Sequence, residues 1–88
     1  MAEISILTSV YNCENYLSDF LDSILNQTFK DFEFIIVNDG STDKSRDVIE
    51  SYRDSRIKLY NFKENIGIAK ALNFGLSKCN GKYVAKAD

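Results

Sequence analysis

The chain has 88 residues, a net charge of −2 and a hydrophobic share of 44%, which together indicate one small globular domain spanning residues 1–88. Acidic and basic residues are spread along the chain, which excludes the clustered basic patch of a nucleic-acid-binding protein. The absence of histidine excludes Ser-His and Cys-His nucleophile pairs, and Cys13 and Cys79 lack the spacing of a metal or redox site. We expect free thiols in a cytoplasmic protein, since there is neither a bilayer-spanning apolar run nor a secretory signal.

Four stretches rich in β-branched and aromatic residues are predicted to be strands, at residues 4–10, 34–37, 57–62 and 83–87. The run 34–37 is apolar throughout, which is typical of a strand that is buried on both faces. The run 57–62 alternates only partly, and we expect it to lie nearer an edge.

Three amphipathic segments separate these strands. The first has an apolar stripe at helical spacing, formed by Leu17, Phe20, Leu21, Ile24 and Leu25. The second covers about residues 43–53, with Ser41 or Thr42 as its expected cap, and the third follows Gly67; Asn12 is the expected cap of the first. Strands that alternate with helical crossovers predict a Rossmann-like α/β open sheet of four parallel strands.

Polar residues follow each predicted strand, and parallel strands bring their carboxyl ends to one edge of the sheet. These residues are Thr8, Tyr11, Asp39, Asn65, Gly67 and Asp88. An aromatic ring beside carboxylates and amides suits a nucleoside, and a carboxylate at Asp88 suits a divalent cation. The pair Asp39-Gly40 is equally typical of a simple turn. No GxGxxG or GxxxxGK[ST] motif is present.

The motifs resemble the nucleotide-binding half of a family 2 glycosyltransferase with the GT-A fold. The resemblance covers nearly the whole chain and rests on residues 6–12, 16–17, 23–28 and 32–33, on VNDGSTD at 37–43, on NIG at 65–67 with ALNFG at 71–75, and on GKYVAKAD at 81–88. It implies a part in inverting transfer from a nucleoside-diphosphate sugar, expected to be UDP-linked, in glycan or surface polysaccharide synthesis. It also allows a peripheral place at the inner membrane face for the full-length protein.

The resemblance assigns roles to several of these residues and to Lys70. Thr8 and Tyr11 would contact the nucleotide base, Tyr11 by packing against it. Asp39 would accept hydrogen bonds from the base or ribose. Lys70 and the backbone around Gly67 would lie near the base or phosphates. Where many members have arginine this chain has Leu72, so that contact is absent.

The last residue, Asp88, would be the first carboxylate of a DxD motif, contacting ribose or lying near Mg²⁺ or Mn²⁺. The second carboxylate and the acceptor half with its general base would be missing, so we expect the 88 residues alone to be inactive and to bind no cation by themselves. A strand edge left bare would favour dimerisation or strand exchange.

Two other interpretations remain open from the residues themselves. A sugar-nucleotide nucleotidyltransferase would need a glycine-rich basic loop after its first strand, and residues 8–15 lack one. A non-catalytic module such as a receiver domain would use Asp39 or Asp88 as phosphate acceptor, but only Glu14 follows the first strand as a partner acid.

Overall fold

The computed structural model describes residues 2–87, which form one four-stranded sheet with helices on both faces. The elements in chain order are β1 (Ile4–Val10), α1 (Glu14–Leu25), β2 (Phe32–Asp39), α2 (Ser45–Glu50), β3 (Ile57–Phe62), α3 (Ile68–Ser77) and β4 (Tyr83–Lys86). All three pairings in the strand order β3-β2-β1-β4 are parallel. The predicted open parallel α/β sheet is therefore confirmed.

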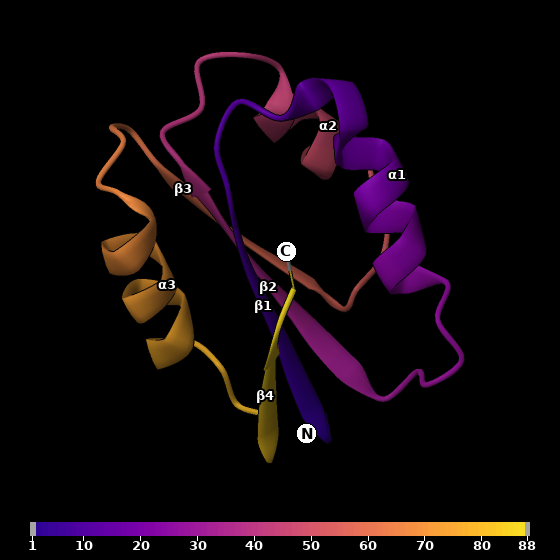
Figure 1. Cartoon of the computed structure of the whole chain (residues 1–88). Helices are drawn as coiled ribbons and strands as arrows, with labels where there is room; N and C mark the ends of the chain where they lie inside the picture. Colours follow the sequence, from indigo (N-terminus) through magenta and orange to yellow (C-terminus); the bar gives the residue numbers. More distant parts are fainter. Residues whose placement is uncertain (1, 88) are drawn as a thin grey trace.

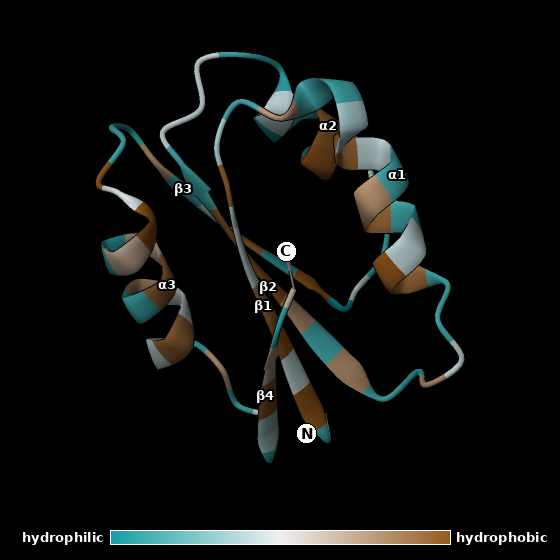
Figure 2. Cartoon of the chain, in the orientation of Figure 1, coloured by the Kyte–Doolittle hydropathy of each residue, from teal (hydrophilic) through white to brown (hydrophobic). Residues whose placement is uncertain are grey.

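The helices divide the sheet into two differently covered faces, with α1 and α2 on one side and α3 on the other (Figure 1). Toward α1 and α2, alternate side chains of β1 and β2 form the main core with the inner stripe of α1; this core includes Ile6, Val10, Leu17, Leu21, Phe32, Phe34 and Ile36. Figure 2 shows the same division, with hydrophobic colours along the central strands and hydrophilic ones on the outer turns of the helices.

Toward α3, the approach is close because Gly75 has no side chain. A Cβ at Gly75 would lie 2.4 Å from Leu7 Cδ1 and 3.0 Å from Val37 Cγ2. Ala71, one turn earlier on the same helix, is fully buried. Small residues at 71 and 75 therefore let α3 lie directly on β1 and β2.

The edge strands differ from the centre as expected. All eight residues of β2 are buried, whereas all four residues of β4 are exposed and β3 is only partly buried. The expected edge position of residues 57–62 is confirmed. Cys13 and Cys79 are free thiols, also as expected. Within residues 2–87, no helix combines the length and apolarity needed to cross a bilayer.

The helix caps expected from sequence are wrong. The N-cap residue is Cys13 for α1 and Lys44 for α2, and neither makes a side-chain capping bond. The second helix begins at Ser45 and ends at Glu50, so Asp43 precedes it. The cause is that Asn12 and Ser41 bond across to each other's loop instead of capping their own helix.

Candidate functional site

Three loops meet at the carboxyl edge of the sheet, where β1, β2 and β3 end (Figure 1). They are residues 11–13 after β1, 40–44 after β2 and 63–67 after β3. In open parallel sheets this edge is where ligands bind.

Asp39, the last residue of β2, anchors the loop that precedes α3. Its side chain is 2% exposed. Oδ1 accepts the N–H of Ile66 at 2.8 Å, and Oδ2 accepts the N–H of Gly67 at 3.0 Å and Nδ2 of Asn65 at 3.1 Å. A carboxylate has about four acceptor positions, so these donors leave about one for a ligand. The structure thus gives Asp39 a structural role and makes it unsuitable as an exposed phosphate acceptor.

Two glycines with positive φ shape the backbone around this carboxylate. At Gly40, with φ of 71°, a Cβ would lie 2.4 Å from both Asn65 N and Glu64 C, so the loops after β2 and β3 touch through their backbones. At Gly67, with φ of 94°, a Cβ would meet no atom within 4 Å, so the backbone faces open space. Both positions require glycine, and Gly67 leaves room for a ligand to approach the chain.

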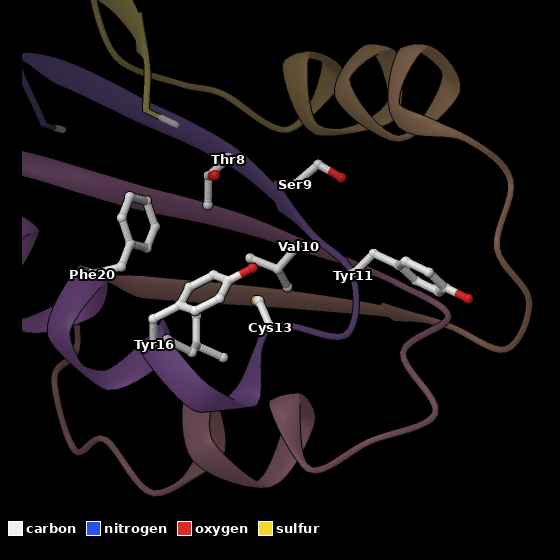
Figure 3. Close-up of a pocket in the computed structure, with 8 residues that line it drawn as sticks. Thr8, Ser9, Val10, Tyr11, Cys13, Tyr16 and Phe20 are labelled. Atoms are coloured by element: carbon white, nitrogen blue, oxygen red, sulfur yellow. The ribbon is translucent and has the colours of Figure 1, made fainter.

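Tyr11 lies beyond the end of β1 and is 50% exposed. Figure 3 shows its ring directed away from Tyr16 and Phe20, which project from α1 toward β1. An exposed aromatic ring at the edge of the sheet provides a flat apolar surface that a base can pack against.

Thr8 and Asp39 are not brought into one cleft. Thr8 is buried on the α1 face, in step with Ile6 and Val10, whereas Asp39 bonds the loop that leads into α3. The prediction that the edge of the sheet brings these polar side chains together therefore does not hold for Thr8 and Asp39. By strand alternation it is Ser9 that faces the α3 side with Asp39, and sequence reasoning missed it.

Thr8 instead lines a cavity of about 240 Å³ between β1 and α1 (Figure 3). The other lining residues are Ser9, Val10, Tyr11, Cys13, Tyr16, Leu17 and Phe20. The volume of about 240 Å³ lies below the about 300–1,000 Å³ of ordinary ligand pockets, so the cavity is small for a whole nucleotide. Burial raises the pKa of the Cys13 thiol on its wall, which makes this sulfur a poor nucleophile near neutral pH.

Lys70 is exposed in the first turn of α3, three residues after Gly67. Asp88 lies outside the described residues. Within residues 2–87 there is no group of three or more His, Cys, Asp or Glu side chains placed to hold a metal ion.

The chain spans only part of the curated relatives it matches. It is 46% identical over 88 residues to the glycosyltransferase GlyA of Streptococcus pneumoniae serotype 4, covering 98% of this chain and 12% of that protein. It is 40% identical to the putative teichuronic acid biosynthesis glycosyltransferase TuaG of Bacillus subtilis, covering 97% of this chain and 34% of that protein. The family model for glycosyl transferase family 2 matches residues 5–88.

The chain belongs to glycosyl transferase family 2.

Solved structures agree with this family at the level of the fold. S. aureus TarS in complex with UDP superimposes with a TM-score of 0.91 at 32% identity, covering 100% of this chain and 27% of TarS. The mannosyltransferase PcManGT of Pyrobaculum calidifontis, in complex with GDP-Man and Mn²⁺, gives a TM-score of 0.85 at 26% identity over 93% of this chain and 26% of that one. The expected partial GT-A fold is confirmed, and the nucleotidyltransferase and receiver interpretations are set aside.

Proposed function

We propose that this chain binds the nucleotide of a nucleoside-diphosphate sugar, UDP-linked, on the α3 side of the carboxyl edge. The observation that carries the proposal is the likeness to TarS, which was solved in complex with UDP. Within a longer protein the bound sugar would pass to an acceptor hydroxyl with inversion, and the name of TuaG supports a role in surface polysaccharide synthesis.

Tyr11, Gly67 and Lys70 are the residues that best suit this nucleotide. The ring of Tyr11 would pack on the base, because it is half-exposed at the end of β1. The open backbone at Gly67 would admit the ribose or diphosphate, and the ammonium of Lys70 would oppose phosphate charge. Asp39 would hold Gly67 in place and use its remaining acceptor position for the base or ribose.

Thr8 would contact a base only if the base entered the cavity beneath α1. The cavity and the α3-side edge are thus two alternative binding sites for the nucleotide base. The α3 side is favoured because the ring of Tyr11 is directed away from Tyr16 and Phe20 (Figure 3).

A divalent cation would be held by Asp88 together with diphosphate oxygens, since residues 2–87 do not form a metal site alone. The Mn²⁺ in the PcManGT complex supports this. When bound, such a cation offsets the charge of the departing nucleoside diphosphate. The described residues would contribute binding and orientation of the donor. A cytoplasmic location, with or without peripheral membrane contact, stays a prediction.

The test is a titration of the ¹⁵N-labelled chain with UDP and Mg²⁺, followed by amide chemical shifts. We expect the largest shifts at Tyr11, Gly67 and Lys70, and small ones at Tyr16 and Phe20. Inorganic pyrophosphate is the matched control, because it should shift Gly67 and Lys70 while leaving Tyr11 unchanged. Shifts confined to Thr8, Tyr16 and Phe20, or no shifts at millimolar UDP, would contradict the proposal.

A further inference from the structure

The loops after β1 and β2 satisfy each other's backbone N–H groups. From the first loop, the N–H of Asn12 donates to Ser41 Oγ at 3.0 Å, that of Cys13 to Ser45 Oγ at 3.0 Å, and that of Glu14 to Asp43 Oδ2 at 3.2 Å. These three side chains all come from the second loop or the start of α2. The amino end of α1 is therefore capped by residues about thirty positions away.

Asn12, from the first loop, also accepts hydrogen bonds from the second loop. Its Oδ1 accepts the N–H of Thr42 at 2.7 Å and the N–H of Asp43 at 3.3 Å. The side chain of Asp43 also accepts the N–H of Ser45 through Oδ1 at 2.9 Å. Because Cys13 does not cap α1 with its side chain, the second loop supplies the acceptors for the amino end of α1, and Asn12 in return accepts two N–H groups of the second loop.

The backbone at Asn12 shows how tightly this arrangement defines the chain. Asn12 has a φ of 48°, and it is the one non-glycine residue with positive φ among residues 2–87. Asparagine tolerates that left-handed conformation better than most residues, and here the conformation directs its amide at the neighbouring loop. Tyr11 thus lies between Val10, the last residue of β1, and Asn12, which is hydrogen-bonded to the second loop.

Electrostatics agree with this geometry. Burial raises the pKa of the Asp43 carboxyl, but hydrogen bonds from Ser45 and from the N–H of Glu14 outweigh it and hold the pKa below its usual value. The carboxylate is then charged at neutral pH, as an acceptor beside the amino end of α1 should be.

We propose that Asn12 and Asp43 are positioning residues for Tyr11: their reciprocal capping of the two loops sets where the aromatic ring stands at the nucleotide edge. This rests on the proposed nucleotide site. It also gives a role to the serine and the aspartate that follow the Asp39-Gly40 turn, since Ser41 and Asp43 accept N–H groups of residues 12 and 14.

The test compares Asn12→Gly, which keeps the positive φ and removes the amide acceptor, with the wild-type chain. Amide hydrogen exchange without ligand measures the contacts between the loops. In Asn12→Gly we expect faster exchange at the Thr42 and Asp43 amides and unchanged protection in β2. Asp43→Ala should likewise speed hydrogen exchange at the amides of Glu14 and Ser45, which donate to the Asp43 carboxylate. Ser23→Ala, which removes a local side-chain bond inside α1, is the control and should change none of these.

The second arm is a double-mutant cycle on UDP affinity. Asn12→Gly alone should weaken binding about fivefold, whereas in a Tyr11→Ala background it should add less than about twofold, because its effect acts through the ring. Equal losses in both backgrounds, or unchanged exchange at Thr42 and Asp43, would overturn the inference.

The two arms separate the possible failures. If the wild-type chain does not bind UDP, the proposed function fails, and hydrogen exchange still decides whether the loops cap each other. Should Asn12→Gly not fold, Ser41→Ala removes one acceptor of the same arrangement and takes its place in the cycle, with the same two outcomes.

Discussion

The central strand β2 and the edge strand β4 run parallel in the same sheet, yet they depend on different supports. Every residue of β2 is buried between α1 and α3, whereas every residue of β4 is exposed and, within residues 2–87, pairs with β1 alone. The position of β4 is instead set at its start, where the N–H of Asn80 donates to Glu33 and the N–H of Gly81 donates to Ser5 Oγ.

The difference shows that the two strands are held in the sheet by different interactions. Hydrophobic burial fixes β2 and with it Asp39, while part-buried hydrogen bonds at the opposite end of the sheet hold the start of β4. Burial raises the pKa of the Glu33 carboxyl, but bonds from Ser5 and the N–H groups of Asn80 and Gly81 bring it below its usual value. Substitutions at the two strands should therefore destabilise the protein in different ways.

The largest effect is expected at the centre, for Phe34→Ala. Phe34 is 0% exposed, and losing its ring should reduce the free energy of unfolding by about 3–5 kcal/mol. Urea denaturation measures this loss. Phe29→Ala is the control, since Phe29 is 48% exposed and should cost less than about 1 kcal/mol. Similar losses of unfolding free energy for both variants would contradict the view that burial of β2 stabilises the core.

A smaller, local effect is expected for Gly81→Ala at the start of β4. The new Cβ would lie 2.5 Å from Ser5 N and 2.7 Å from Ile4 C, both backbone atoms that cannot move aside. We expect a cost of about 1–3 kcal/mol and faster hydrogen exchange in β4 than in β2.

Gly75→Ala sharpens this test. Its Cβ would lie 2.4 Å from the end of the Leu7 side chain and 3.0 Å from Val37 Cγ2, side-chain atoms that can shift where backbone cannot, and alanine improves helix propensity by about 1 kcal/mol, so we expect a smaller cost than for Gly81→Ala. A Gly75 variant as damaging as the Gly81 variant would show that backbone contact is not what distinguishes the start of β4.

The other edge strand, β3, should carry a pH dependence of its own, from the residues just before it. Hydrogen bonds from Arg56 lower the pKa of Asp54 from 3.8 to about 2, and Arg56 also donates to the carbonyl of Leu25. Because the folded-state pKa is the lower one, this stabilisation is complete above about pH 4 and is lost as pH falls through about 2. After allowance for solvent screening we expect about 1 kcal/mol, absent in Asp54→Asn, from denaturation at several pH values.

The weakest effect expected is self-association through the bare edge of β4. Tyr83 and Val84 are exposed there, and an unpaired strand edge can accept a strand from a second copy. Light scattering should show a mass that rises with protein concentration, and less so for Val84→Lys. A monomer at every concentration would reject the prediction.

Local patterns predicted the strands well because strand identity depends on nearby residues. Both β1 at Ile4–Val10 and β3 at Ile57–Phe62 match the expected ranges. The face to which each side chain points was harder. Residues 4–10 do not alternate cleanly between apolar and polar, so Thr8 and Ser9 could not be assigned to opposite faces before the register was known.

The loop contacts could not be predicted from local sequence either. Asn12 looks like an ordinary helix cap, and its real partners, Thr42 and Asp43, lie 30 and 31 residues away. Asp39 was found because an acid after a buried strand is a recognisable signal. That its oxygens bond Asn65, Ile66 and Gly67 depends on how the loop before α3 folds back, which only the structure shows.

The most direct test of the nucleotide site is the affinity for UDP of Tyr11→Ala and Tyr16→Ala, measured by calorimetry with Mg²⁺. Both exposed tyrosines contribute to the cavity under α1, but the ring of Tyr11 is directed away from Tyr16, so Tyr11 is the one placed to contact a base outside the cavity. We predict about tenfold weaker binding for Tyr11→Ala, from the lost stacking surface, and unchanged binding for Tyr16→Ala. The reverse order of affinities would contradict a nucleotide site on the α3 side.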